Sequence, residues 1–303
     1  MLKTNNEIVR RTRKEMGLSQ RELAEQLFMD QKALSRIESG KKNLNVWEYL
    51  SIMQMVGRPE ENFYRLMLES KEFEDYCTYK ELRRLIRDGK HSEAKDILAD
   101  FEKNLTATQS FLHQYVAFAK VYLDSEMPHE EAVERLYEVL RMSIRDFDKS
   151  KMAKYRYDYN EVHILSAIAI KLDKMGETEQ AIDIYKALIE SRNNILGTDE
   201  DKAALLPALL YSLSSLLGKT GDYIGALKYC EEAYEISKKY YNLRLIPYIL
   251  YNIASCSHKL NKGEEICKPY LVRAYHSAYA IGYTEVAAEI KKDAKESFGI
   301  VDL

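Results

Sequence analysis

A short pattern occurs five times in the last three quarters of the chain, and it limits the fold more than any other feature. In each copy, a helix-like segment ends at a turn, and the next segment carries a small residue followed four and seven positions later by apolar residues. A small side chain lets two helices approach closely, and each helical hairpin leaves an apolar face that the next must cover. The sequence therefore predicts stacked hairpins. The small residues are Ala94, Ala132, Ala181, Ala226 and Cys267, at spacings of 38, 49, 45 and 41 residues.

The composition agrees with a helical fold, since 303 residues contain only 12 glycines and 5 prolines. Such low contents exclude turn-rich β architectures and long disordered tails. The run GDYIGALKYCEEA at 221–233 resembles the second half of a tetratricopeptide repeat, although the present units are longer than the usual period of about 34 residues. We predict an all-α protein. Residues 72–303 would form a right-handed superhelix of about five hairpins, and 283–297 would form a capping helix.

The net charge of −3 hides an asymmetry along the chain. Residues 1–42 hold ten basic and six acidic residues, a net charge of +4, so the remainder carries −7. A basic segment attached to an acidic body indicates two modules with different partners, and a basic module suits a polyphosphate such as DNA.

The basic segment has the pattern of three short helices. The first is expected over 5–15, with Met16 on its apolar face and Gly17 as its end. Ser19–Glu22 is a capping box that opens a second helix reaching Phe28. Asp30 is expected to cap a third helix that ends at Gly40. Two short helices with so brief a turn are typical of a helix-turn-helix, whose second helix enters the major groove.

The polar residues of these helices have the chemistry of a DNA interface. Gln can read adenine and Arg can read guanine through paired hydrogen bonds, while lysines and helix amides bind phosphate. The alternative is a three-helix hairpin with solvated polar faces. The predicted DNA-binding residues are Ser19, Gln20, Gln31, Lys32, Ser35, Arg36, Lys41 and Lys42.

The motifs GLSQRELA and LSRIESGK resemble the repressor/Cro-type helix-turn-helix of the XRE family over residues 5 to about 65. The resemblance implies a buried pair between Arg13 and Glu38. It also implies base reading by Gln31, Lys32 and Arg36, with Gln20 on the DNA backbone. We assign residues 1–65 to this domain, which is expected to contain about four to five helices.

The hairpin array is expected to bind a ligand on its inner face. Aligning the repeats on their small residues places a polar, uncharged set with interspersed aromatic rings on that face. Amide groups pair with peptide backbones and tyrosines supply apolar walls, so a short linear peptide is the expected guest. The set comprises Gln114, His163, Ser166, Tyr211, Ser215 and Asn252.

The order of these two modules, with ENFYRLML between them and EISKKYYNLRLIPYILYNIASCSHKL near the end, resembles the RNPP group of Gram-positive regulators, most nearly its PlcR-like branch. The resemblance implies a dimeric cytoplasmic transcription factor that binds an imported signalling peptide. It places Asn252 in the register of peptide-clamping asparagines. A linker helix over 60–75 would connect the modules, and a dimer would prefer an inverted-repeat operator.

Other functions have little support in the sequence. No catalytic, nucleotide-binding or metal-ligand spacing occurs, so no enzyme, cofactor or metal is expected. Neither a signal peptide nor a membrane span is indicated, and the cysteines are expected to be reduced. Two alternatives remain: a DNA-tethered scaffold whose repeats bind a partner protein, and a regulator that acts without a ligand.

Overall fold

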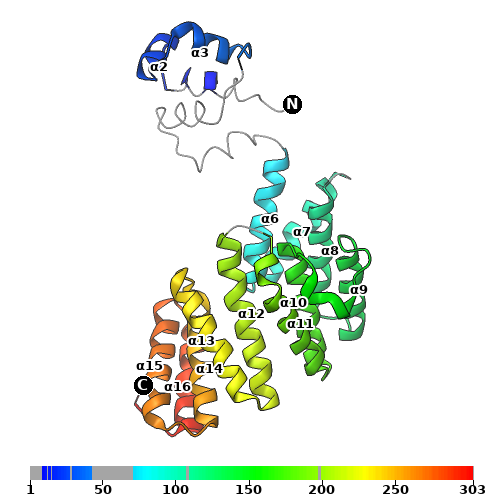
Figure 1. Cartoon of the computed structure of the whole chain (residues 1–303), viewed down its shortest axis with the longest axis vertical. Coiled ribbons are helices and arrows are strands. Elements are labelled where there is room, and N and C mark those ends of the chain that lie inside the picture. Colours follow the sequence, from blue (N-terminus) through cyan, green and yellow to red (C-terminus); the bar gives the residue numbers. More distant parts are fainter. Residues whose placement is uncertain are drawn as a thin grey trace. The chain divides into compact units, whose positions relative to one another are not determined.

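The computed structural model describes residues 9–11, 13–14, 16–27, 29–42, 71–106, 109–196 and 199–302. Every regular element in these ranges is a helix, and none of them contains a strand, which confirms the predicted all-α class (Figure 1). The chain divides into two compact units, residues 1–112 and 113–303. The end of the predicted helix-turn-helix domain and most of the predicted linker lie outside the described residues, so the boundary at residue 65 stays a prediction.

The first unit contains the helix-turn-helix pair, α2 (Gln20–Gln26) and α3 (Gln31–Glu38). Ser19 and Glu22 form the predicted capping box, each side chain binding the backbone N–H of the other. Asp30 occupies the N-cap position of α3, but its side chain makes no capping hydrogen bond, so the predicted side-chain cap is wrong. α2 ends at Gln26, two residues before the predicted end.

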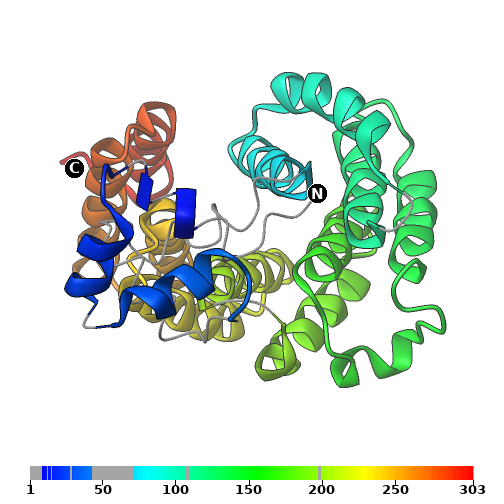
Figure 2. The same ribbon diagram turned by 90° about the horizontal axis from the view of Figure 1, so that it is seen from above.

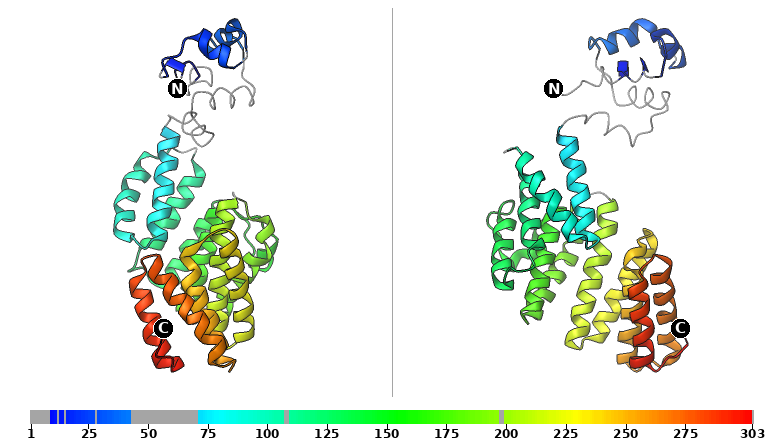
Figure 3. Two further views of the ribbon diagram at one scale, coloured as in Figure 1. Left: turned by 90° about the vertical axis from the view of Figure 1, so that its left-hand side faces the viewer. Right: turned by 180° about the vertical axis from the view of Figure 1, so that it is seen from behind.

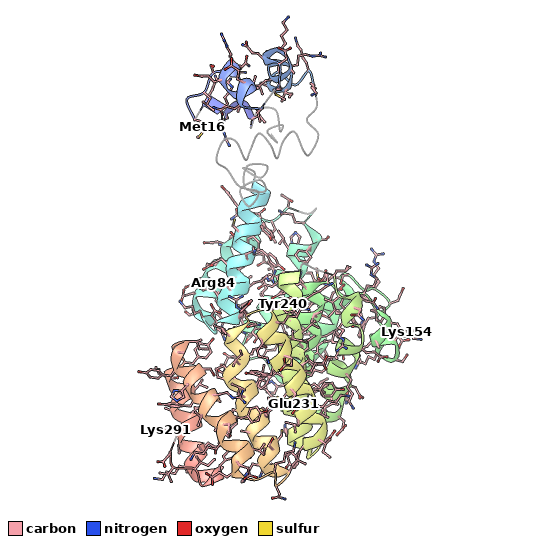
Figure 4. All side chains as sticks on the ribbon, turned by 60° about the vertical axis from the view of Figure 1, so that its left-hand side comes forward. Met16, Arg84, Lys154, Glu231, Tyr240 and Lys291 are labelled. Carbon is pink, nitrogen blue, oxygen red and sulfur yellow. The ribbon has the colours of Figure 1, made fainter. Side chains whose placement is uncertain are left out.

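The first helix does not bury the residue that was predicted to lie on its inward face. Met16 is 51% exposed (Figure 4), whereas Val9 is fully buried and Arg13 is nearly so. The spacing of apolar residues gave the wrong inward face because this helix buries the charged residue Arg13, and a pattern of apolar residues cannot reveal a buried charge. Gly17 adopts a left-handed conformation (φ 70°), and the Leu18 N–H bonds to the Arg13 carbonyl, which ends this helix as predicted.

The first unit also contains the first hairpin, formed by α6 (Lys71–Arg87) and α7 (His91–Asn104). α6 includes the last residues of the predicted linker, 71–75. Leu82 and Leu85 of α6 are buried, as are Ala94 and Leu98 of α7. The two helices therefore pack through the face that contains the repeated small residue.

The second unit is itself a series of helical hairpins, in which neighbouring helices from α9 to α16 pack against one another (Figure 2). Its first helix, α8, begins just before the division between the units. Short 3-10 turns lie between some hairpins. The elements are α8 (Ser110–Leu123), α9 (His129–Arg141), η1 (Lys149–Lys154), α10 (Tyr159–Lys174), α11 (Thr178–Glu190), η2 (Arg192–Asn194), α12 (Asp199–Thr220), α13 (Tyr223–Lys239), η3 (Leu243–Leu245), α14 (Ile246–Lys259), α15 (Glu264–Ala280) and α16 (Thr284–Phe298).

The repeated small residue has the same structural place in every hairpin, which confirms its predicted role. It is the fourth residue of the second helix, and in all five copies it is at most 1% exposed. A larger side chain at so buried a position would overpack the core. The five positions are Ala94, Ala132, Ala181, Ala226 and Cys267.

The turn between α12 and α13 shows how so short a connection is made. Gly221 has φ 92°, a conformation that a side chain disfavours, and the Asp222 N–H bonds to the Leu217 carbonyl at 2.9 Å. Asp222 then caps α13 by accepting a hydrogen bond from the Gly225 N–H at 2.9 Å. One residue that ends a helix is thus followed directly by the cap of the next.

The terminal helix α16 covers the last hairpin, close to the predicted range (Figure 3). Ala287, Ile290 and Ala294 of α16 pack with Leu250 of α14 and Leu271 of α15 in one buried cluster. Since no further hairpin follows in the described chain, α16 supplies the apolar partner that α14 and α15 otherwise lack.

One helix segment, Lys202–Thr220 of α12, is long and apolar enough to cross a membrane by length and composition. Half of it is buried inside the protein, and α12 packs against both α11 and α13. Its apolar character is accounted for by its place as a core helix of the hairpin stack.

Candidate functional site

The exposed face of α3 carries the side chains predicted to read bases. Gln31, Lys32 and Arg36 are exposed and Ser35 is partly exposed, whereas Leu34 and Ile37 are buried beneath them. Lys41 follows α3 and is exposed, and Lys42 is partly exposed. α3 thus presents hydrogen-bonding and cationic groups on one side and its apolar residues on the other, as insertion into a DNA groove requires.

A buried ion pair fixes the position of α3 within the N-terminal helix-turn-helix segment, here called the head. Arg13 donates from Nε to Glu38 Oε1 at 2.6 Å and from Nη2 to Oε2 at 2.8 Å, while its Nη1 donates to the Leu18 carbonyl at 2.6 Å. The two side chains are 9% and 2% exposed. These contacts connect the first helix, the turn before α2 and the end of α3.

Gln20 completes this cluster, because its Nε2 donates to Glu38 Oε2 at 2.8 Å. The sequence predicted Gln20 only as a contact to the DNA backbone, and its amide also has this internal partner. Burial acts to raise the pKa of Glu38, but the hydrogen bonds from Arg13 and Gln20, together with the charge of Arg13, outweigh it and the pKa lies below its usual value. Glu38 is therefore a carboxylate at neutral pH.

Five of the six residues predicted to bind a peptide are partly exposed on the first helices of their hairpins. His163 and Ser166 lie on α10, Tyr211 and Ser215 on α12, and Asn252 on α14. The His163 ring packs against Tyr159 at 4.3 Å between centroids. The Ser166 hydroxyl donates to the Val162 carbonyl of its own helix at 2.8 Å.

The prediction for Gln114 is wrong. Gln114 is 2% exposed, and its Nε2 donates to the Val139 carbonyl at 3.1 Å and to Ser143 Oγ at 2.7 Å, so its amide joins α8 to the end of α9. Aligning repeats on the second helix assumes turns of equal length within each hairpin. The turn at 124–128 is longer than the one at 175–177, which displaces the register of α8.

Asn252 is held in place by a buried serine of the neighbouring hairpin. Its Nδ2 donates to Ser214 Oγ at 3.0 Å, and Ser214, which is fully buried, donates to the Ala226 carbonyl at 2.7 Å. Cys256 Sγ lies 3.8 Å from Asn252 Oδ1. Burial raises the pKa of Cys256 to about 11, so the thiol is protonated at neutral pH. This arrangement orients the Asn252 amide while leaving that residue partly exposed.

Ser214→Ala is expected to destabilise the second unit by about 1–2 kcal/mol, because it removes a fully buried hydroxyl that accepts from Asn252 Nδ2 and donates to the Ala226 carbonyl. The midpoint of thermal unfolding of the full chain should fall by about 2–8 °C. Ser255→Ala, on the partly exposed face of α14, is the control and should change the midpoint little. Equal shifts in the two variants would contradict the proposed role of Ser214.

Tyr211 and Tyr248 bring α12 and α14 together beside this amide, with ring centroids 6.3 Å apart. Tyr211 also bonds to Ser215, four residues on, and burial raises the pKa of its hydroxyl although the bond to Ser215 opposes that rise. The sequence reasoning missed Tyr248. Its position four residues before Asn252 places it on the same helix face, a signal that could have identified it.

Comparisons with known proteins agree with both modules. A helix-turn-helix family model matches residues 9–46, and the model of the RNPP family C-terminal domain matches 77–298. A search of curated protein sequences gave no match. A helix-turn-helix joined to this domain defines a DNA-binding transcription regulator and not an enzyme. The chain belongs to the RNPP family.

Solved structures of low sequence identity share the fold. PlcR of Bacillus thuringiensis, in complex with the peptide PapR7 and DNA, is 19% identical with a TM-score of 0.70, over 96% of this chain and 98% of PlcR. ComR from S. thermophilus, in complex with DNA and its signalling peptide ComS, is 15% identical with a TM-score of 0.63, over 98% and 100%. The SHP pheromone receptor Rgg2 of Streptococcus dysgalactiae is 14% identical with a TM-score of 0.54, over 96% and 99%.

Proposed function

We propose that this regulator binds a specific DNA sequence through α3 and is controlled by a short peptide bound on the inner face of its hairpins. The observation that carries the proposal is the combination of exposed Gln31, Lys32 and Arg36 on a helix-turn-helix with an RNPP C-terminal domain. Structures of the same fold contain DNA together with a peptide, PapR7 in PlcR and the signalling peptide ComS in ComR. Ser19, Gln20, Lys41 and Lys42 would contact phosphates.

The peptide site is assigned to the partly exposed residues of α10, α12 and α14. These groups are uncharged and combine amide, hydroxyl and aromatic chemistry, which suits a peptide backbone and apolar side chains. The residues are His163, Ser166, Tyr211, Ser215 and Asn252.

Regulation requires that the peptide bind one arrangement of the DNA-binding heads better than another. A peptide with equal affinity for both arrangements would leave the equilibrium between them unchanged. We assign the active form to a homodimer on an inverted-repeat operator, in which two heads occupy half-sites about one helical turn apart or a multiple of it. A DNA-bound regulator acts inside the cell, and a cytoplasmic location follows from the proposal.

The proposal is tested with the purified full chain, a selected operator duplex and synthetic peptides of five to ten residues. Peptide binding is followed by calorimetry and operator binding by fluorescence anisotropy. We expect at least one peptide to bind and to change operator affinity about 5- to 150-fold. Bound peptides that leave operator affinity unchanged would favour a ligand-independent regulator. A large partner protein that binds the repeats while every peptide fails would favour the scaffold.

A further inference from the structure

The connection between α9 and α10 is long and helps to enclose a cavity. It spans residues 142–158 and contains η1, whereas the connection between α13 and α14 spans only 240–245. η1 packs against α11. A cavity of about 270 Å³ lies here, and its walls come from α9, η1, α10 and α11. None of the residues assigned to the peptide lines it, so the cavity is separate from the proposed peptide face.

Aromatic contacts hold this connection in place. The ring centroids of Tyr137 and Phe147 are 6.0 Å apart, and those of Phe147 and Tyr155 are 5.5 Å apart. The hydroxyl of the buried Tyr157 donates to the Met152 carbonyl at 2.7 Å. Because Tyr137 and Met152 both line the cavity, these contacts fix its walls before a guest arrives. Such preorganisation lowers the entropic cost of binding.

Much of the cavity wall is apolar. Tyr137, Leu172 and Ile184 line it, and all three are buried in the hairpin stack. Met152 adds a flexible side chain that adapts to the shape of a guest. The volume lies just below the range of about 300–1,000 Å³ that is typical of pockets for drug-sized ligands. A guest about as large as one amino acid, with an apolar side chain, therefore fits these walls.

Two opposite charges line the same cavity. Lys149 lies on η1, and its Nζ is 4.4 Å from the centre of the Tyr137 ring. Asp183 lies on α11. Neither forms an ion pair with another residue that the structure describes, whereas the nearby Lys151 is paired with Asp148 at 2.9 Å. The cavity thus presents a cation and a carboxylate, on different elements, that do not neutralise each other.

Gln180 adds a neutral acceptor beside Asp183. Its Nε2 donates to Glu177 Oε2 at 2.9 Å, which leaves its amide oxygen to accept from a guest. The charge along the two elements agrees with this polarity. The six residues of η1, KSKMAK, contain three lysines and no acid, and ETEQAID at 177–183 contains three acids and no base. A guest with its carboxylate toward η1 and its ammonium toward α11 is therefore oriented by the field.

We propose that this cavity binds a free α-amino acid with an apolar side chain. The carboxylate pairs with Lys149, the ammonium binds Asp183 and Gln180, and the side chain packs on the apolar walls. A fatty acid would leave Asp183 without a counter-charge, and a simple amine would leave Lys149 without one. The inference goes beyond the proposed function, because it gives the regulator a small-molecule site apart from the peptide face.

The probes are L-leucine and derivatives that each lack one of its features. N-acetyl-L-leucine has no ammonium group, and L-leucinamide has no carboxylate. Ligand-detected NMR with the purified full chain at one ionic strength gives the dissociation constants. L-leucine should bind saturably, and each derivative should bind at least about fivefold more weakly. L-alanine and L-glutamate should bind at least about tenfold more weakly, because they bury less apolar surface or an unmatched charge.

Variants test each charge against the matching derivative. Lys149→Met should weaken L-leucine at least about fivefold and change L-leucinamide less than about twofold, because that derivative has no carboxylate for the lysine to bind. Asp183→Asn should weaken L-leucine similarly and change N-acetyl-L-leucine less than about twofold. A residue with a merely structural role would affect all three ligands alike.

Lys154→Met and Asp146→Asn are the matched controls. Both residues are exposed on the same connection, where Figure 4 labels Lys154, and neither lines the cavity. Both variants should bind L-leucine like the unchanged chain. Circular dichroism confirms that the variants are folded.

Three results would overturn the inference. The first is that L-leucine, L-methionine and L-phenylalanine all fail to bind. The second is equal affinity for L-leucine and its two derivatives, which would remove the roles of both charges. The third is a loss in Lys149→Met or Asp183→Asn no greater than in its control, which would place the site elsewhere. None of these measurements involves operator or peptide, so the proposed function is tested independently.

Discussion

Glu38→Ala should unfold or severely loosen the helix-turn-helix while the hairpins stay folded. The substitution leaves the Arg13 guanidinium buried without its carboxylate and removes the acceptor of Gln20. Breaking a buried pair in this way costs about 3–5 kcal/mol, a large share of the stability of a small domain. Hydrogen exchange of the α3 amides in the full chain should accelerate about 10²- to 5 × 10³-fold, and operator binding should be lost.

Two variants test whether the buried charge causes this loss. Glu25→Ala breaks the ion pair between Arg21 and Glu25, whose side chains are 77% and 63% exposed respectively. It should change the hydrogen-exchange rate of the α3 amides by less than about fivefold. Replacing both partners, with Arg13→Met and Glu38→Leu, should recover most of the protection, because no unpaired charge remains. If the double variant exchanges as fast as Glu38→Ala, desolvation of Arg13 is not the cause.

The pH dependence of the head follows from the same pair. The pKa of Glu38 is lower in the folded head than in the unfolded chain, so the unfolded state binds the proton more readily. The stabilisation is therefore fully present above the unfolded pKa, about 4.3, and is lost as the pH falls through the lower folded value. Protection of α3 should decrease in acid, and the Arg13→Met, Glu38→Leu variant should lack this component of the decrease.

Gln31→Ala and Arg36→Ala should together abolish most sequence discrimination without unfolding the head. Both side chains are exposed on α3, and paired hydrogen bonds to a base contribute about 1–3 kcal/mol each. For the double variant, we expect the ratio of operator to random-duplex affinity to fall about 30-fold or more. Anisotropy titrations with both duplexes at one salt concentration measure this ratio.

Lys41→Ala is the matched comparison, because Lys41 is exposed beside α3 and is assigned to phosphate. It should weaken operator and random duplex alike and reduce the slope of log affinity against log salt by about one. If Gln31→Ala and Arg36→Ala both keep the original base preference, the assignment of α3 as the helix that contacts the bases is contradicted.

The sequence revealed patterns of side-chain size and of helical spacing. It did not reveal which residues far apart in the chain contact one another. The five small residues, the capping box at Ser19 and the terminal helix all follow from local spacing, and each has its expected place. Gln114 was misassigned because a turn of different length displaced its helix. Met16 was misassigned because its helix turns a charged residue inward.

The sequence by itself determined the all-α class, the hairpin repeat and the helix-turn-helix, because helix periodicity, capping and small-residue positions act over a few neighbouring residues. Only the tertiary structure decided which of these side chains have partners far away in the sequence. Gln20 binds Glu38 across 18 residues, Asn252 binds Ser214 across 38, and Tyr211 meets Tyr248 and, through it, Tyr283. Such contacts depend on how neighbouring helices are rotated and offset, and that geometry is set by the packing of whole hairpins.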